Sequence, residues 1–118
     1  MWTVVYYVAD NGTCLVERFL KGLDRATQIG FLASIDVLRN INLRAREPFV
    51  HHVEGKLWEL PEMNNRRVYR LIYFLFSGQH IVFLHGFETK IHEVPPRYEI
   101  EIALECLMNF MNREGTKE

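Results

Sequence analysis

The 118-residue chain lacks the signatures of several large functional classes. It has two cysteines, Cys14 and Cys106, which lie far apart and have no CxxC or Cys/His companion. Neither a disulfide framework nor a zinc knuckle is indicated, so both are expected to be reduced packing residues. The sequence also contains no GxxxxGK followed by Ser or Thr, no GxGxxG, no GxSxG and no HExxH. These absences argue against phosphate-loop chemistry and the common hydrolase mechanisms.

Long apolar runs and a targeting segment are missing as well. The longest uncharged apolar run, Leu71 to Phe76, has six residues, whereas a membrane-spanning helix needs roughly 20. The first ten residues carry no basic residue before their apolar stretch and no small-residue cleavage site, so a secretory signal is not indicated. We therefore expect a cytoplasmic protein without a membrane partner.

What the sequence does contain is the composition of one globular domain. Hydrophobic residues make up 48%, aromatic residues 13% and charged residues 25% of the chain, which excludes intrinsic disorder and predicts a single domain over residues 1–118. The net charge is −1, although residues 39–70 are basic and residues 88–118 acidic. Proteins that bind nucleic acids usually carry a clear excess of positive charge, and this chain does not. The net charge therefore neither supports nor excludes a nucleic-acid partner.

Hydrophobic periodicity predicts a strand and two helices in the first 40 residues. The strand is expected at Trp2–Val8, a short helix from a cap at Thr13 to about Gly22, and a longer helix from a cap at Asp24 to about Asn40. The longer helix has an apolar side that is expected to face the core: Phe31, Leu32, Ile35 and Leu38. The two helices should form a hairpin.

The rest of the chain predicts a sheet and a final helix. After a loop at Asn40–His52, strands are expected at Val53–Leu60, Arg67–Phe76 and Gln79–Phe87, forming an antiparallel meander. Pro95-Pro96 favours entry into a helix with an apolar stripe of Ile100, Leu104, Leu107, Met108 and Met111. Because both faces of the later strands are apolar, helices must cover both sides. The prediction is an α+β fold in the order β-α-α-β-β-β-α, with its helices packed on an antiparallel sheet.

Arg70 is the most informative candidate for chemistry, because it lies within the apolar strand Val68 to Phe76. An arginine there must reach solvent or pair with an acid. One interpretation is a structural ion pair with Glu59 or Glu54 of the neighbouring strand. The other is a guanidinium aimed at phosphate from a rigid strand, for which its planar donors are suited.

Other phosphate-competent groups are expected near Arg70 in such a meander. They are Lys56 on the preceding strand, Arg66 and Arg67 at the strand entry, and Lys90 and His92 just past the last strand. RNA cleavage by the 2′-hydroxyl needs a base, an acid and cations, and these side chains supply them without a metal or other cofactor. Tyr69, Tyr73 and Tyr98 are candidates for stacking on a base, with core or surface packing as the alternative.

The five histidines do not predict a metal centre. His80 and His85 are five apart on one expected strand and so should point to opposite faces. His51 and His52 are neighbours in the expected loop, without a Cys or acidic partner at ligand spacing. We expect them to be surface or packing residues.

Four segments carry a family resemblance: GKLWEL (55–60), YRLIYFLFSG (69–78), IVFLHGF (81–87) and PPRYEIEIA (95–103). Over about residues 50–110 the chain resembles the phage-derived, HigB-like branch of the RelE/ParE toxin superfamily. The resemblance implies a toxin that enters the ribosomal A site and cleaves mRNA, held inactive by a cognate helix-turn-helix antitoxin.

The resemblance also implies roles for single residues. Arg70 occupies the arginine of the family's YRxxY strand, and Lys90 falls in the lysine-rich segment after HGF, while Lys56, Arg67 and His92 match more loosely. Two alternatives to a ribosome-dependent endoribonuclease stay open at this point. One is a non-catalytic relative that binds the antitoxin as a regulatory module, and the other is a gyrase-directed toxin. The oligomeric state and the surface that binds the antitoxin are not predicted.

Overall fold

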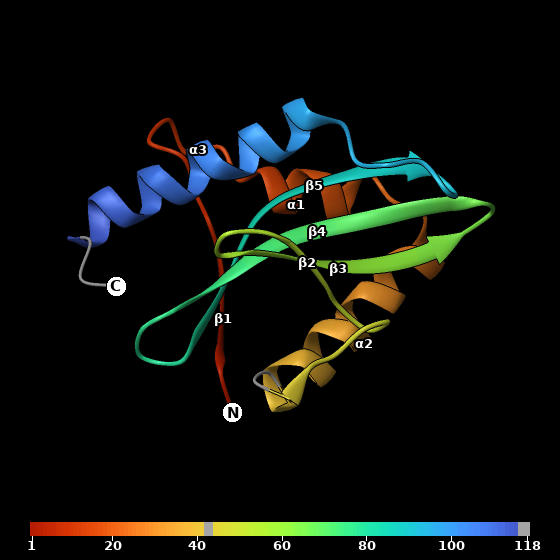
Figure 1. The fold of residues 1–118 in the computed structure, drawn as a ribbon, viewed down its shortest axis with the longest axis horizontal. Coiled ribbons are helices and arrows are strands. Elements are labelled where there is room, and N and C mark those ends of the chain that lie inside the picture. Colours follow the sequence, from red (N-terminus) through yellow and green to blue (C-terminus); the bar gives the residue numbers. More distant parts are fainter. Residues whose placement is uncertain (42–43, 116–118) are drawn as a thin grey trace.

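A five-stranded mixed sheet forms the centre of the protein, with helices on both of its faces (Figure 1). The computed structural model describes residues 1–41 and 44–115. The elements in chain order are β1 (Thr3–Tyr6), α1 (Leu15–Lys21), α2 (Arg25–Ile41), β2 (His51–Glu54), β3 (Leu57–Asn64), β4 (Arg67–Phe76), β5 (His80–Lys90) and α3 (Arg97–Glu114). This single α+β domain is consistent with a RelE-like fold, as expected.

The strand order is β1-β5-β4-β3-β2, and four of the strands form an antiparallel meander. The fifth corrects the prediction of an antiparallel sheet, because β1 pairs with β5 in parallel, with Thr3 opposite His80 and Tyr6 opposite Phe83. Apolar alternation marks a strand but carries no information on its direction. The parallel pairing of β1 with β5 could therefore not be predicted from the sequence.

The expected strand Val53–Leu60 is divided by a turn at Gly55 and Lys56: its first two residues end β2, and Leu57–Leu60 begin β3. Gly55 adopts φ +52°, a left-handed conformation that glycine reaches without strain, and β2 and β3 pair on either side of it. His51 and His52, predicted in a loop, form the start of β2. The element order is thus β-α-α-β-β-β-β-α. β3 continues through Pro61, which lies beyond the last β2 partner, where a missing N–H is tolerated.

The two faces of the sheet bury separate apolar cores. On one face, Phe31, Ile35 and Leu38 of α2 pack with Leu71, Tyr73 and Phe83, which confirms that this side of α2 packs on the sheet that contains β4. We call this the hairpin face. On the other, the α3 face, Ile100, Ala103 and Leu107 pack on Ile72, Phe74 and Leu84. Figure 1 shows α2 and α3 on opposite sides of the strands.

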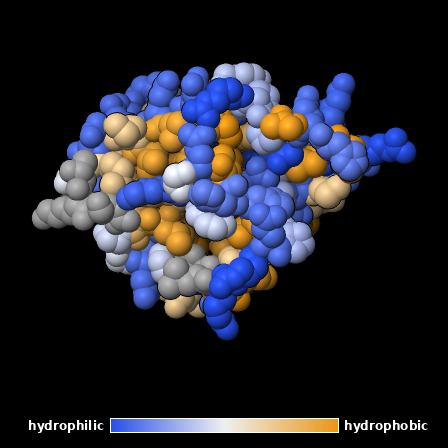
Figure 2. Space-filling model, in the orientation of Figure 1, coloured by the Kyte–Doolittle hydropathy of each residue, from blue (hydrophilic) through white to orange (hydrophobic). Residues whose placement is uncertain are grey.

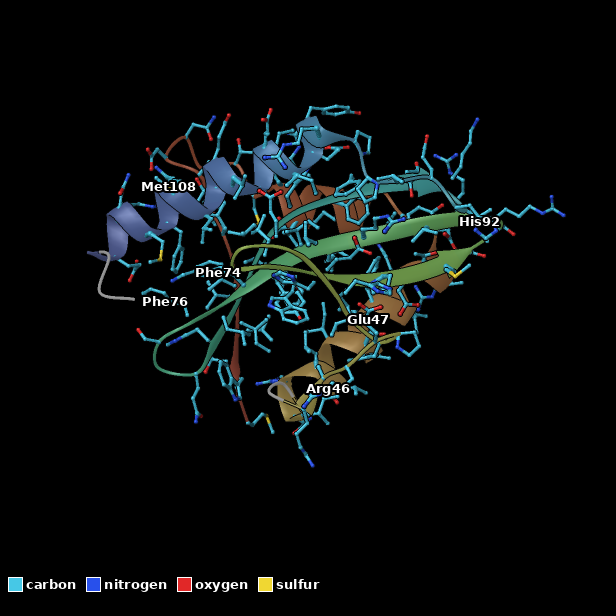
Figure 3. The ribbon with its side chains drawn as sticks, viewed as in Figure 1. Arg46, Glu47, Phe74, Phe76, His92 and Met108 are labelled. Atoms are coloured by element: carbon cyan, nitrogen blue, oxygen red, sulfur yellow. The ribbon has the colours of Figure 1, made fainter. Side chains whose placement is uncertain are left out.

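Two predicted core positions are wrong, since Leu32 is 58% exposed on α2 and Met108 is 61% exposed on α3. Each helix rests on a sheet rather than inside a bundle, so its buried stripe is narrower than the apolar stripe in the sequence. Figure 3 places Met108 on the outer part of α3.

Of the two predicted side-chain caps at helix starts, one is present. Asp24 caps α2, because its carboxylate accepts hydrogen bonds from the backbone N–H and the hydroxyl of Thr27. The predicted cap at Thr13 is wrong. α1 begins after Cys14, which makes no capping side-chain bond, and the Thr13 N–H instead donates to Asn11 Oδ1, closing an Asx turn. Among the described residues, none of the helices is long and apolar enough to cross a membrane.

Candidate functional site

Arg70 lies on β4 with its guanidinium on the α3 face. Its Nη1 donates to Glu59 Oε2 over 2.6 Å, its Nε donates to Thr89 Oγ1 over 3.2 Å, and its Nη2 donates to the Glu93 carbonyl over 3.3 Å. The side chains of Arg70 and Glu59 are 13% and 3% exposed. The predicted structural ion pair is therefore present, with Glu59 as the partner, while Glu54 pairs with Arg97 at the surface.

The pair stands at the floor of an open hollow in the surface. This hollow has a volume of about 380 Å³ and is lined by His51, Glu54, Glu59, Arg70, Val94, Pro95 and Ile100, among others. A second hollow of about 460 Å³ shares His51, Glu59 and Arg70 and extends to Pro48, Glu62 and Val68. Arg70 and Glu59 thus combine near-complete burial with contact to space that a ligand can enter.

His51 completes this group from the neighbouring strand. Its Cα partner across the β2–β3 ladder is Glu59, and residues directly opposite each other share a face. His51 Nδ1 lies 3.1 Å from Glu47 Oε1, and Figure 3 shows Glu47 in the segment between α2 and the sheet. Three adjacent strands therefore bring together an imidazole, a carboxylate and a guanidinium, which we call the His51–Glu59–Arg70 group.

The other predicted cations gather elsewhere, at the end of the sheet where the β3–β4 turn meets the last residues of β5. Arg67 is the Cα partner of Lys90, and the Arg66 carbonyl accepts a bond from the backbone of Ile91. His92 follows with φ +67°, and Figure 3 labels it at this end. We call Arg66, Arg67, Lys90 and His92 the basic tip; Figure 2 shows mostly hydrophilic side chains projecting there.

The sheet separates Arg67 and Lys90 of the basic tip from the Arg70 guanidinium. Arg67 precedes Arg70 by three positions on β4, so its side chain leaves the opposite face. It pairs with Glu88 over 2.9 Å, which neutralises part of the positive charge. Lys90 and His92 are exposed, and the Lys90 backbone N–H donates to the Glu93 carboxylate.

Lys56 is not near either group. It is exposed in the β2–β3 turn, five residues along the chain from Pro61, the cross-strand partner of Arg70. At roughly 3.3 Å per residue this separation is about 16 Å. The structure therefore divides the five predicted residues among three places.

The three candidate tyrosines have different environments. Tyr73 is buried in the core on the hairpin face, and burial raises the pKa of its hydroxyl strongly. Tyr69 is partly buried beside the basic tip, and its pKa is raised by desolvation and then by the charge of Glu88. Tyr98 is 62% exposed at the start of α3. Tyr73 is thus a packing residue, while Tyr69 and Tyr98 remain accessible.

The prediction that His80 and His85 face opposite sides of the sheet is wrong. The β4–β5 ladder shifts register between Ile72 and Tyr73, so Leu84 is an extra residue. Because of this extra residue, His85 lies on the same α3 face as His80. Its Nε2 is 2.8 Å from Glu99 Oε1 of α3. Among the described residues, no cluster of three or more His, Cys, Asp or Glu side chains could hold a metal ion.

Sequence reasoning identified Arg70 and gave Glu59 or Glu54 as its partner, of which Glu59 is the one found, but it missed His51. The available signal was Gly55, which allows a two-strand hairpin and places His51 opposite Glu59. The alternation over Val53–Leu60 masked that turn.

Residues 18–107 match the family model described as "Phage derived protein Gp49-like (DUF891)". The matched region begins within α1 and ends within α3, and it contains the His51–Glu59–Arg70 group and the basic tip. No curated protein matches the chain.

Proposed function

Because the chain belongs to the phage-derived Gp49-like family, a toxin-like family, we propose that it is the toxin of a type II toxin–antitoxin system and cleaves mRNA in the ribosomal A site. The reaction is a metal-independent attack of the 2′-hydroxyl on the adjacent phosphate. A cognate helix-turn-helix antitoxin holds the toxin inactive until it is needed.

The observation that carries this proposal is the fixed guanidinium of Arg70 at the floor of an open hollow. Three of its five N–H groups donate to Glu59, Thr89 and Glu93, and no acceptor within residues 1–41 and 44–115 occupies the other two. A guanidinium held on a strand before substrate arrives needs no reorganisation to stabilise a phosphorane. Removing one such preorganised donor typically costs about a hundredfold to a thousandfold in rate.

The basic tip supplies a second element of the proposal. Arg66, Lys90 and His92 are exposed at one end of the sheet, where they can contact the RNA backbone without entering the hollow. Such contacts position a nucleic acid and carry little sequence information. In this arrangement Arg70 acts on the scissile phosphate, while Lys90, Arg67 and His92 bind flanking phosphates.

A second candidate function is favoured by the same ion pair. Because Glu59 already neutralises Arg70, the pair is sufficient as a structural feature of a non-catalytic relative. Such a relative would keep the fold and the antitoxin-binding surface, and serve as a regulatory module without cleaving RNA.

Induced expression with and without the neighbouring reading frame separates these functions. The endoribonuclease predicts growth arrest, with new RNA ends inside translated messages and none in messages whose start codon is removed. Co-expression of a helix-turn-helix neighbour should abolish both effects and allow the two proteins to be purified together. Growth without new ends identifies the regulatory module. Arrest with relaxed or cleaved DNA, and no RNA ends, identifies a gyrase-directed toxin.

A further inference from the structure

The His51–Glu59–Arg70 group contains an acid–base pair that the proposed function does not yet use. His51 and Glu59 are directly opposed on β2 and β3, so their Cβ atoms are about 5 Å apart. Both side chains line both hollows, together with Arg70. An RNA phosphate that reached the guanidinium would therefore lie beside the Glu59 carboxylate, with the imidazole one strand further along the same face.

Each member of the pair has one position left for a substrate. Glu59 uses Oε2 for Arg70, and its Oε1 accepts no hydrogen bond from the described residues. His51 Nδ1 lies 3.1 Å from Glu47 Oε1, so Nε2 is the ring nitrogen that points away from this carboxylate. A carboxylate that holds one imidazole nitrogen fixes the ring orientation for chemistry at the other.

We infer that Glu59 and His51 are the general base and general acid for RNA phosphodiester cleavage, with Glu47 as a positioning residue. Glu59 Oε1 takes the proton of the 2′-hydroxyl, and the 2′-oxygen forms a bond to phosphorus. The bond from phosphorus to the 5′-oxygen breaks, and His51 Nε2 gives its proton to that oxygen. The products are a 2′,3′-cyclic phosphate and a 5′-hydroxyl, and no oxidant, reductant or metal is consumed. This inference rests on the proposed function.

Three of the remaining histidines, His52, His80 and His85, have other environments. His52 is the cross-strand partner of Trp58, whose ring lies 5.0 Å from its own. His85 is 8% exposed and bonded to Glu99. His80 Nδ1 is 2.8 Å from the Ser77 carbonyl at the far end of β5. Of these imidazoles, only His51 faces Glu59 across a strand pair.

Single-turnover cleavage of mRNA on purified ribosomes tests the assignment, with His80→Asn as the matched control for His51→Asn. We expect the rate to fall by about a hundredfold to ten-thousandfold in His51→Asn and to stay unchanged in His80→Asn. The wild-type pH profile should be bell-shaped, and His51→Asn should lose its alkaline limb. Glu47→Gln should cause a smaller loss of rate than His51→Asn.

A binding measurement keeps the inference testable apart from turnover. In protein labelled with ¹³C-histidine, adenosine 3′-monophosphate should shift the His51 resonance and leave that of His80 in place, and Glu47→Gln should reduce this shift. Cleavage by His51→Asn at the wild-type rate, or an unmoved His51 resonance, overturns the acid–base assignment while leaving the toxin function intact. Absence of ribosome-dependent cleavage by the wild-type protein overturns the proposed function itself. Circular dichroism of each variant confirms that it is folded.

Discussion

The ring of Phe19 in α1 packs directly on the α-carbon of Gly86 in β5. A Cβ atom added at position 86 would overlap the ring carbons of Phe19. Glycine within a strand commonly marks such a close approach of another element. The contact fixes α1 on the hairpin face and explains why the HGF segment carries a glycine between His85 and Phe87.

We expect Gly86→Ala to lower the free energy of unfolding by about 1 to 3 kcal/mol, the usual cost of overpacking. Gly22→Ala is the matched control, because Gly22 has φ −81° and its added Cβ would meet only carbonyl oxygens at 3.6 Å. Urea unfolding measures both variants. Combining Gly86→Ala with Phe19→Leu should recover part of the loss; equal stability of Gly86→Ala and wild type would contradict the contact.

The sequence predicted most of the fold because local patterns specify its elements strongly. The caps and apolar faces of α2 and α3, and the long apolar strands β4 and β5, depend on neighbours within a few residues. Relations between distant segments were less accessible. The parallel pairing of Thr3 with His80 and the bulge at Leu84 are set by packing across the domain.

In the candidate site, too, local features were predicted from the sequence and the relations between distant residues were not. Arg70 stood out because a charge interrupted an apolar strand, and its partner Glu59 lies on the neighbouring strand. The grouping of Lys56, Arg67 and Lys90 around Arg70 required knowledge of face and register. The strand period of two residues sends Arg67 to the other side of the sheet, and the turn at Gly55 moves Lys56 to its far end.

Arg70→Ala is expected to destabilise the protein by roughly 3 to 5 kcal/mol, because it leaves the carboxylate of Glu59 buried without a cation. The double variant Arg70→Met with Glu59→Gln should recover most of this stability, since a buried ion pair can be replaced by uncharged groups at small cost. Its mRNA cleavage should remain lost. Recovery of cleavage together with stability would show that the pair is only structural.

Arg97→Ala is the control for that series, because Arg97 pairs with Glu54 at the surface, where its side chain is 61% exposed. Its stability should change little. Arg70→Lys adds a sharper comparison. A lysine keeps the charge but cannot reach Glu59, Thr89 and Glu93 with one planar group. The cleavage rate of Arg70→Lys should therefore fall even though the positive charge is kept.

The basic tip should contribute to affinity for RNA rather than to folding. Arg66→Ala and Lys90→Ala each remove an exposed cation, and each should reduce the slope of log affinity against log salt by about 0.7 for single-stranded RNA. Lys21→Ala on α1 provides an exposed control away from the tip. Lys56→Ala should resemble this control. Fluorescence anisotropy with a labelled single-stranded RNA at several salt concentrations measures the slopes, and unchanged slopes at both tip positions would remove the tip from the RNA-binding surface.

Asp24 should make stability depend on pH in the acid range. Its carboxylate accepts bonds from the Thr27 hydroxyl, the Thr27 N–H and the Asn64 amide, which joins the start of α2 to β3. These bonds, that of the Thr27 hydroxyl most of all, hold the pKa of Asp24 below its ordinary value in the folded protein. A group with a lowered folded pKa stabilises the fold above its unfolded pKa and loses that effect as the pH falls through the folded pKa.

Asp24→Ala should therefore melt earlier than wild type at pH 7, and the difference should shrink as the pH falls below about 3.9, the ordinary pKa of aspartate. Asp36→Ala removes an exposed carboxylate from the middle of the same helix and should not show this convergence. Thermal midpoints from pH 7 to pH 2 measure both variants; a difference for Asp24→Ala that stays constant over this range would mean that its charge does not support the cap.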